Sequence, residues 1–465
     1  MAYGGYSYLD RKYEPGKDDF IALFWVEGDD PIEKLAEALA AESSIGTWTK
    51  LGTMNKRVWD LRARVFKIAK VTKKSGLVWI AYPFEHFDAR NMLQFQASVL
   101  GNVFGLKELK SLIALDITFP KRFQQQYLGP GHGLEGVRKY VGTGKSRRPH
   151  IGTIVKPKVG LSPREFAKVA YEAYMGGCDF VKDDENLVNQ RFCPFEDRVM
   201  EMFEVIDKVE DETGRKVLYS PNITDSYNNM LMRRDFLISQ DARMAMIDVF
   251  IMGYSAMQDI VDQLRRDGFM MHAHRAGFAA ESRGEFGVSY TIHQKFYRLI
   301  GVDQLHIGTG VGKMEGSPLY IKALHDLAVK DRMEDKLYVG IMKTEWDSGI
   351  APMMPVASGG VGVGIIEPLL ALHGNDVNVQ AGGGIHGHPK GTRAGATAML
   401  QAVQAAMEGI PLPKYAKTHK ELAEALKKWK YVSPNSVKKL LEQEKKKAAA
   451  LRRRALSKGI KYIER

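Results

Sequence analysis

The chain has 465 residues, of which 45% are hydrophobic and 26% are charged, an ordinary globular composition that excludes wholesale disorder, a collagen repeat and a fibrous coil. At roughly 100–200 residues per domain, and up to about 250 for a closed α/β barrel, this length predicts two domains with large cores. The net charge of +12 could indicate a nucleic-acid partner, but residues 438–465 alone hold eleven Lys and Arg against three acids. We interpret that segment as a charged terminal helix, solvated or facing another subunit, and consider a nucleic-acid partner the weaker alternative.

The cysteines and the apolar runs indicate the cellular compartment. Cys178 and Cys193 are too few for a disulfide framework and are not spaced as a zinc site. The first residues lack the apolar run of a signal peptide, and no run of about eighteen apolar residues could cross a membrane. We therefore expect a cytoplasmic protein without a membrane partner.

The first part of the chain mixes strand and helix patterns without regular alternation, which predicts an α+β domain over residues 1–135. Residues 18–28 and 76–84 are strand-like, because they are rich in aromatic and β-branched side chains. Residues 31–44 and 90–105 carry apolar side chains at helical spacing.

From His150 onward, apolar strand-like runs alternate regularly with amphipathic helical stretches. Eight such runs follow one another in about 260 residues: 150–158, 178–186, 216–224, 244–253, 269–277, 302–310, 354–360 and 377–384. Eight βα units are what a closed parallel (β/α)₈ barrel needs, whereas a doubly wound sheet usually uses fewer. We predict a TIM barrel with C-terminal helices over residues 136–435, followed by a basic helical tail over residues 436–465.

The second strand of this barrel ends in the sequence KDDE, residues 182–185. Because side chains alternate along a strand, Lys182 and Asp184 face the same way, with Glu185 just past the turn. Two converging carboxylates suit Mg²⁺, and a deprotonated lysine that captures CO₂ as a carbamate would add a third oxygen ligand. The alternative is one Lys–Asp ion pair with solvated acids, and this run alone does not decide between the two.

Further cations and histidines gather at other strand ends, where they could stabilise an enediolate or bind a phosphate. They are Lys156 and Lys158 after the first strand, His272, His274 and Arg275 on the fifth, and His306 on the sixth. A pair of lysines is more often a solvated strand end, and a single histidine is more often structural. Histidines on adjacent strand ends favour the functional interpretation.

Glycines mark the remaining loops at this face of the barrel. Residues 308–318 bracket Lys313 with glycines, a composition typical of a mobile loop that carries one cation over a site. Ser358-Gly359-Gly360 and Gly382-Gly383-Gly384 end the last two strands, where backbone N–H groups can bind phosphate. From the residues alone we predict a Mg²⁺ barrel enzyme that acts on a phosphorylated carbonyl substrate through an enolate-type intermediate.

Together these motifs resemble the large subunit of ribulose-1,5-bisphosphate carboxylase/oxygenase (RuBisCO), from about Tyr8 to near residue 430. The most specific pieces are GTIVKPKVGLSP (152–163), GGCDFVKDDEN (176–186), HIGTGVGKMEG (306–316) and QAGGGIHGHP (380–389). The details are closest to archaeal-type form III or form II/III enzymes, which assemble without small subunits. The resemblance implies a carboxy-lyase that enolises D-ribulose 1,5-bisphosphate and adds CO₂, with O₂ as a side substrate, to give two 3-phosphoglycerates.

The resemblance also implies catalytic roles. Lys182, carbamylated by an activator CO₂, would hold Mg²⁺ with Asp184 and Glu185. The carbamate would take the C3 proton with the assistance of His274. Three lysines would serve the other steps: Lys156 as general acid and base on the C2 side, Lys158 as its support, and Lys313 as the cation that stabilises the new carboxylate.

Substrate contacts follow from the same resemblance. Arg275 and His306 would bind one phosphate, Ser358 the substrate backbone, and Thr153 falls on a substrate-contacting position. The other phosphate would be held by Gly359, Gly360, Gly382 and Gly383, with Thr47 and Trp48. Family members use N-terminal residues, here Glu42, Thr47, Trp48 and Asn102, in the neighbouring subunit's barrel. We therefore expect an obligate homodimer, or a ring of dimers.

One departure from the family pattern stands close to the site. A second histidine usually follows His-Arg-Ala after one residue, whereas this chain has Phe278, which loses a polar contact and puts turnover and CO₂/O₂ discrimination in doubt. The alternatives are a RuBisCO-like isomerase of a sulfur-containing sugar phosphate and a polyanion-binding scaffold acting through the tail. Nucleotide salvage and a Calvin-type pathway both stay open.

Overall fold

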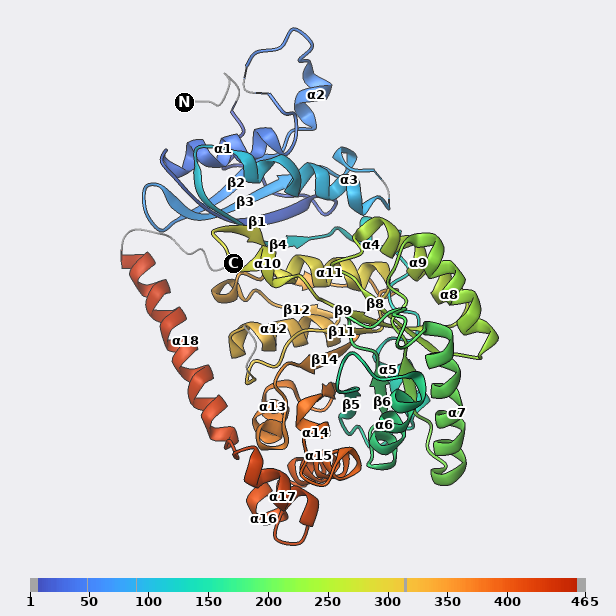
Figure 1. Cartoon of the computed structure of the whole chain (residues 1–465). Helices are drawn as coiled ribbons and strands as arrows, with labels where there is room; N and C mark the ends of the chain where they lie inside the picture. Colours follow the sequence, from blue (N-terminus) through green and yellow to red (C-terminus); the bar gives the residue numbers. More distant parts are fainter. Residues whose placement is uncertain (1–6, 48, 89, 313–315, 458–465) are drawn as a thin grey trace.

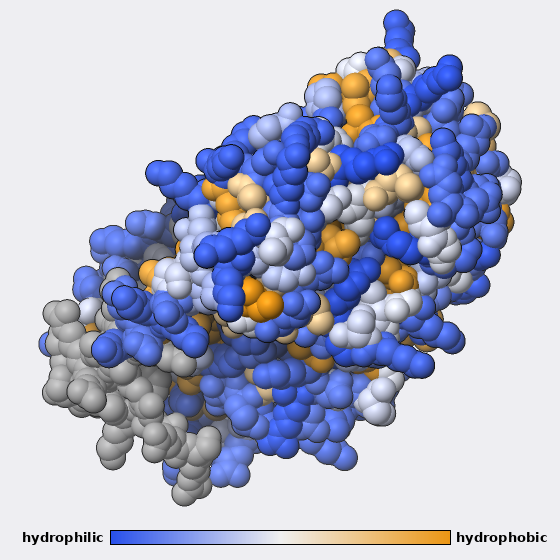
Figure 2. All heavy atoms as spheres, turned by 90° about the horizontal axis from the view of Figure 1, so that it is seen from below, coloured by the Kyte–Doolittle hydropathy of each residue, from blue (hydrophilic) through white to orange (hydrophobic). Residues whose placement is uncertain are grey.

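The computed structural model describes residues 7–47, 49–88, 90–312 and 316–457. Figure 1 shows a sheet with helices at the N-terminal end of the molecule, set against a barrel built from the rest of the chain. Across the described ranges, no helix combines the length and the apolar character that a bilayer crossing needs. The face drawn in Figure 2 is mainly hydrophilic, with small scattered apolar patches.

The N-terminal sheet has the order β10-β4-β1-β3-β2. Its antiparallel strands are β1 (Phe20–Gly28), β2 (Arg64–Lys70), β3 (Ser75–Tyr82) and β4 (Leu109–Thr118). Helix α1 (Ile32–Glu42) packs on this sheet, and short helix α2 covers Lys56–Asp60. The strands predicted over 18–28 and 76–84 and the helix over 31–44 are confirmed. The helical stretch predicted over 90–105 is broken, because only α3 (Met92–Gln96) is α-helical. A π-helical turn and then a 3₁₀ turn follow it.

The barrel contains all eight predicted strands, in the order β7-β6-β5-β15-β14-β11-β9-β8. They are β5 (His150–Ile154), β6 (Phe180–Lys182), β7 (Leu218–Ser220), β8 (Met244–Asp248), β9 (Met270–His274), β11 (Gln304–His306), β14 (Met354–Ser358) and β15 (Asn378–Gln380). All neighbouring pairs in this order are parallel. The amide of Met246 donates to Pro221 O at 2.8 Å, and the amide of Ile223 donates to Met246 O at 3.1 Å. These bonds join the segment that follows β7 to β8, the two ends of the strand order, so the predicted closed barrel is confirmed.

Helices surround the barrel strands. The longer ones are α5 (Gly133–Val141), α6 (Pro163–Met175), α7 (Phe195–Thr213), α8 (Tyr227–Ser239), α9 (Tyr254–Arg266), α11 (Tyr290–Ile300), α12 (Pro318–Val329), α13 (Ile366–His373) and α15 (Thr392–Met407). Shorter elements are α4 (Lys121–Gln124), α10 (Ala279–Ser282), α14 (Gly383–His386), α16 (Leu412–Tyr415), α17 (Lys420–Lys428), β12 (Arg332–Met333) and β13 (Thr344–Glu345). Helix α6 shows how the local sequence starts a helix. Ser162 and Glu165 form a capping box, and Pro163 occupies the first turn.

The two parts of the molecule are joined by buried contacts and by one strand. Strand β10 (Phe286–Val288), which belongs to the segment between β9 and α11, pairs in parallel with β4 of the N-terminal sheet. The buried ammonium of Lys295 on α11 lies 2.7 Å from the buried carboxylate of Asp116 on β4 and also donates to Ile117 O at 2.9 Å. Phe296 of α11 packs edge-on against Phe95 and at a tilt against Phe119 of the N-terminal domain.

Helix α18 (Pro434–Ser457) begins after the last barrel helices and runs along one side of the molecule, as Figure 1 shows. Val437 is buried, and the carboxylate of Glu444 accepts a hydrogen bond from the Leu319 amide at 3.0 Å. The start of the basic tail is therefore a helix that packs on α12 and α13 of its own chain.

Candidate active site

A cavity of about 730 Å³ opens at the carboxyl ends of the barrel strands. It is lined by twelve residues that the sequence predicted: Lys156, Lys182, Asp184, Glu185, His274, Arg275, His306, Ser358, Gly359, Gly360, Gly382 and Gly383. The alternation of strands and helices places these side chains together, because the carboxyl ends of parallel barrel strands meet at one face.

Lys182 is the last residue of β6 and is completely buried. Its ammonium donates to Asp183 O at 2.6 Å, touches Met246 Sδ at 3.3 Å and lies 3.9 Å from Glu185 Oε2. Burial lowers the pKa of Lys182, although the nearby carboxylates, Glu185 first, oppose that shift. The amine therefore loses its proton more easily than a free lysine does.

Asp184 follows Lys182 on the same face, as the alternation predicts. Its Oδ2 accepts a hydrogen bond from Lys156 Nζ at 2.8 Å, and its Oδ1 accepts from the Asn186 side chain at 2.9 Å. Burial alone would raise the pKa of Asp184, but the hydrogen bonds from Lys156 and Asn186 outweigh it, so the pKa is lowered. This carboxylate stays ionised as a hard oxygen ligand must.

Asp183 points the other way and has a structural role. Its carboxylate pairs with the buried guanidinium of Arg198 at 2.9 Å, and it accepts from Tyr219 Oη at 2.7 Å and from the Asn222 amide at 2.8 Å. These contacts tie β6 to α7 and β7. The three consecutive acids therefore separate into one that supports the barrel and two that face the cavity.

The fit of this cluster to a divalent cation depends on Lys182. In the described residues, no three His, Cys, Asp or Glu side chains gather as metal ligands. Two carboxylates, Asp184 and Glu185, face the cavity beside an amine whose pKa is lowered. A carbamate on that amine would supply the third anionic oxygen, so the donor set fits Mg²⁺ once the lysine has reacted with CO₂.

His274, at the end of β9, lies between two carboxylates. Its Nδ1 is 3.2 Å from Asp248 Oδ1 and its Nε2 is 3.6 Å from Glu185 Oε2, while the Ala276 amide donates to Nδ1 at 3.2 Å. Asp248 was not among the predicted residues. The fourth strand was predicted to run to residue 253, whereas β8 ends at Asp248, so a shorter strand would have placed this acid at the site.

His306 is held by a second histidine inside the barrel. Nδ1 of His272 lies 2.9 Å from Gln304 Oε1, and its Nε2 lies 3.0 Å from His306 Nε2, so the two rings share a hydrogen bond. Burial and the neighbouring cations lower the pKa of both rings well below the usual range. His272 therefore orients His306 and does not itself line the cavity.

The glycine segments at the ends of β14 and β15 form another part of the cavity wall. Gly359 and Gly360 have φ values of 111° and 76°, which favour glycine. A Cβ on Gly384 would lie 2.1 Å from Val361 O, so the two segments pack backbone against backbone. Trp429, which the sequence did not single out, also lines this side.

Several predicted residues lie away from this cavity. Thr153 is buried in the barrel wall, where its hydroxyl contacts Ala381 O at 2.7 Å and His386 Nε2 at 2.8 Å. Lys158 is exposed beyond the lining. Glu42, Thr47 and Asn102 lie in the N-terminal domain and do not line the cavity of their own chain, and Trp48 and Lys313 lie outside the described residues.

Comparison with known families decides the relationship. The catalytic-domain model of the ribulose bisphosphate carboxylase large chain matches residues 135–429, and the N-terminal-domain model matches residues 7–123. The chain belongs to the ribulose bisphosphate carboxylase large chain family. The RuBisCO family predicted from the sequence motifs is thereby confirmed.

Archaeal RuBisCO proteins are similar over almost the whole chain. Ribulose bisphosphate carboxylase of Methanocaldococcus jannaschii is 45% identical over 429 residues, covering 91% of this chain and 100% of that relative. The dimeric archaeal RuBisCO of Hyperthermus butylicus has a TM-score of 0.86 at 38% identity, covering 91% of this chain and 99% of that structure. An octameric RuBisCO of Pyrococcus horikoshii has a TM-score of 0.84 at 38% identity, covering 92% and 97%. An archaeal-type form III enzyme fits these relatives.

Proposed function

We propose that this chain is a ribulose-bisphosphate carboxylase that works through a carbamate on Lys182. The single observation that carries this proposal is the buried amine of Lys182 beside Glu185 and Asp184. It lies at a strand end of the barrel that the ribulose bisphosphate carboxylase catalytic-domain model matches. The reaction is enolisation of ribulose 1,5-bisphosphate, addition of CO₂ at C2, addition of one solvent water at C3, and cleavage of the C2–C3 bond to two 3-phosphoglycerates.

Activation would precede catalysis. The neutral amine of Lys182 attacks CO₂, a nitrogen–carbon bond forms, and the proton leaves to solvent. RuBisCO enzymes generally use Mg²⁺, which here would be held by the carbamate, Asp184 and Glu185 and would polarise the substrate oxygens. Asp184 now holds Lys156. When Asp184 becomes a ligand of Mg²⁺, it would release the Lys156 ammonium toward the substrate.

The proton transfers would use the same residues. The carbamate of Lys182 takes the C3 proton, with His274 beside it between Glu185 and Asp248. Lys156 donates and removes protons on the C2 side, and Lys158 supports it. Lys313 would stabilise the carboxylate that forms when CO₂ adds.

The substrate phosphates would occupy two parts of the cavity. Arg275 and His306 would bind one phosphate, and backbone N–H groups of the glycine segments would bind the other. Ser358 would contact the substrate backbone between them, while Thr153 would shape the wall by holding Ala381.

A second subunit would complete the site. Glu42, Thr47 and Asn102 do not line their own cavity, which supports their use, together with Trp48, in a neighbouring barrel. The dimeric and octameric archaeal relatives support a homodimer or a ring of dimers without small subunits. A cytoplasmic location stays a prediction, and the choice between nucleotide salvage and a Calvin-type pathway stays open.

Labelled CO₂ tests the proposal. The protein, purified anaerobically, would be preincubated with bicarbonate and Mg²⁺ and given ribulose 1,5-bisphosphate. We expect acid-stable label in 3-phosphoglycerate, lost in Lys182→Ala and Lys313→Ala and retained in Lys208→Ala, which removes an exposed lysine of α7.

Absence of label from a folded wild-type dimer would contradict carboxylation. Histidine would then be restored at Phe278 before the isomerase alternative is tested with a sulfur-containing sugar phosphate.

A further inference from the structure

Tyr290 contacts the two predicted side-chain ligands of one phosphate, Arg275 and His306. It is the first residue of α11 and is 1% exposed. Its hydroxyl donates to the backbone carbonyl of His306 at 2.6 Å. This bond ties the start of the helix to the end of β11, directly at one of the two predicted phosphate ligands.

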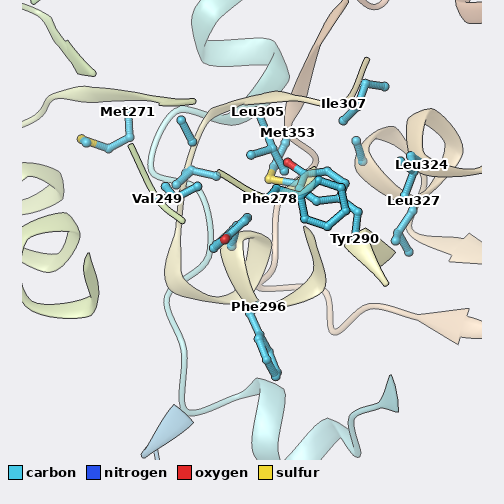
Figure 3. Close-up of a cluster of buried hydrophobic side chains, with 14 of the residues drawn as sticks. Val249, Met271, Phe278, Tyr290, Phe296, Leu305, Ile307, Leu324, Leu327 and Met353 are labelled. Atoms are coloured by element: carbon cyan, nitrogen blue, oxygen red, sulfur yellow. The ribbon is translucent and has the colours of Figure 1, made fainter. Parts of the chain in front are cut away.

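The ring of the same tyrosine supports the other ligand. The guanidinium carbon of Arg275 lies 4.4 Å from the ring centre of Tyr290 and 5.4 Å from that of Phe278. The two rings pack against each other with centres 4.6 Å apart, and Figure 3 shows them side by side in the buried cluster. A cation above an aromatic face is attracted by the ring's negative quadrupole, so the two rings fix the plane and position of the guanidinium.

The surroundings keep this arrangement rigid. Burial raises the pKa of Tyr290, with Arg275 opposing the shift, so the hydroxyl remains a donor over the working range of pH. Just after β11, the parallel neighbour of β9, a Cβ at Gly308 would lie 2.9 Å from Arg275 Nη2. Glycine there leaves room for the guanidinium, which is confined between the Gly308 backbone and the aromatic rings.

We propose that Tyr290 is a positioning residue that holds Arg275 and His306 in register for one phosphate group of a sugar bisphosphate. The inference rests on the proposed function, since it assumes that these two side chains receive a phosphate. Tyr290 does not touch the substrate. It acts through Arg275 by its ring and through His306 by its hydroxyl, and Phe278 completes the support by the ring alone.

Two variants of Tyr290 separate its two contacts. Tyr290→Phe keeps the ring and removes the hydroxyl, whereas Tyr290→Leu removes both. We expect the dissociation constant and the KM for ribulose 1,5-bisphosphate to rise about threefold in Tyr290→Phe and about tenfold in Tyr290→Leu, with kcat changed by less than about twofold. Phe278→Leu, which keeps apolar bulk and removes the second ring, should raise them about twofold.

The matched control is Tyr297→Phe. Tyr297 is a buried tyrosine on the same helix, and its ring stacks on Tyr254 and His293. This variant should leave both constants unchanged, which would show that loss of a buried hydroxyl from α11 is not itself the cause.

A double-mutant cycle tests whether Tyr290 acts through Arg275. On an Arg275→Ala background, Tyr290→Leu should weaken bisphosphate binding by no more than about threefold, because only the His306 contact is then lost. An undiminished tenfold effect on that background would overturn the proposal, and so would wild-type binding by Tyr290→Phe and Phe278→Leu. The latter two variants keep the test decisive if Tyr290→Leu does not fold.

Failure of this inference and failure of the proposed function would look different. A wild-type enzyme that carboxylates while the Tyr290 variants bind normally contradicts the inference alone. A wild-type protein that binds ribulose 1,5-bisphosphate without carboxylating it contradicts the proposed function. The binding series would still decide the role of Tyr290 in that case.

Discussion

The two sides of the cavity hold their charged groups by different means. On the side of β6, the ammonium groups and carboxylates hold one another: Lys156 binds Asp184, and Lys182 lies near Glu185. On the side of β9 and β11, Arg275 rests on aromatic rings and His306 is held by a hydroxyl and a neutral histidine. The first arrangement has to rearrange when a metal arrives, whereas the second is already set for an anion. A site can therefore be adjustable where it is activated and rigid where it binds.

The largest expected effect comes from the acid that supports the adjustable side. Asp183→Asn would leave the buried guanidinium of Arg198 without its countercharge, and we expect a loss of about 3–5 kcal/mol in the free energy of unfolding. Denaturant titration measures it, with Asp207→Asn as the control at an exposed position of α7. Equal stability of the two variants would show that Asp183 does not anchor β6.

The rate of activation, which takes place at Lys182 on the β6 side of the cavity, should depend steeply on pH. Only the neutral amine of Lys182 adds CO₂, so the rate of activation should rise about tenfold per pH unit below the pKa and level off above it. Because burial lowers this pKa, the plateau should begin at a lower pH than for an exposed lysine. Preincubation at different pH values followed by assay at one pH isolates this step. A flat profile would contradict carbamylation as the limiting event.

Asp248 should matter to turnover more than to binding. Asp248→Asn removes the negative charge 3.2 Å from His274 Nδ1 and should lower kcat about tenfold, with the KM for bisphosphate changed by less than about twofold. Steady-state kinetics after full activation would measure both constants. A change confined to KM would place Asp248 with the binding side instead.

The smallest effect is expected on the rigid side. Phe278→His restores the residue usual in the family, yet the nearer ring under Arg275 is that of Tyr290, so bisphosphate affinity should fall only about twofold. Calorimetric titration of wild type and variant would show it. A marked gain in kcat would instead support the lost polar contact inferred from the sequence.

Periodic patterns made much of this molecule predictable. The alternation of apolar runs and amphipathic helices after His150 specifies the barrel, and alternation within KDDE separates Asp183 from Asp184. Asp248 was missed because the apolar run continues through Val249 and Phe250, which hides the strand end. The assignment of Thr153 to a substrate-contacting position came from the resemblance and stays a prediction; its hydroxyl donates to Ala381 O in the barrel wall.

Contacts between distant segments were not predictable in the same way. Strand β10 is three residues long and pairs with a strand more than a hundred residues earlier. It is too short for a repeating pattern of apolar side chains to predict it. Trp429 reaches the cavity from beyond the last barrel helix. The aromatic support of Arg275 depends on a strand end and a helix start that meet only in the folded chain.

Strand β10 also has a consequence for how the protein unfolds. It is part of the segment between β9 and α11, and its hydrogen bonds belong to the N-terminal sheet: the Leu112 amide donates to Glu285 O at 2.9 Å, and the Ser289 amide donates to Ala114 O at 2.8 Å. Neither domain can melt alone without losing backbone pairing in the other, so calorimetry should record one cooperative transition. A chain cleaved in the connector between the domains would still hold its halves together, in the manner of a split protein.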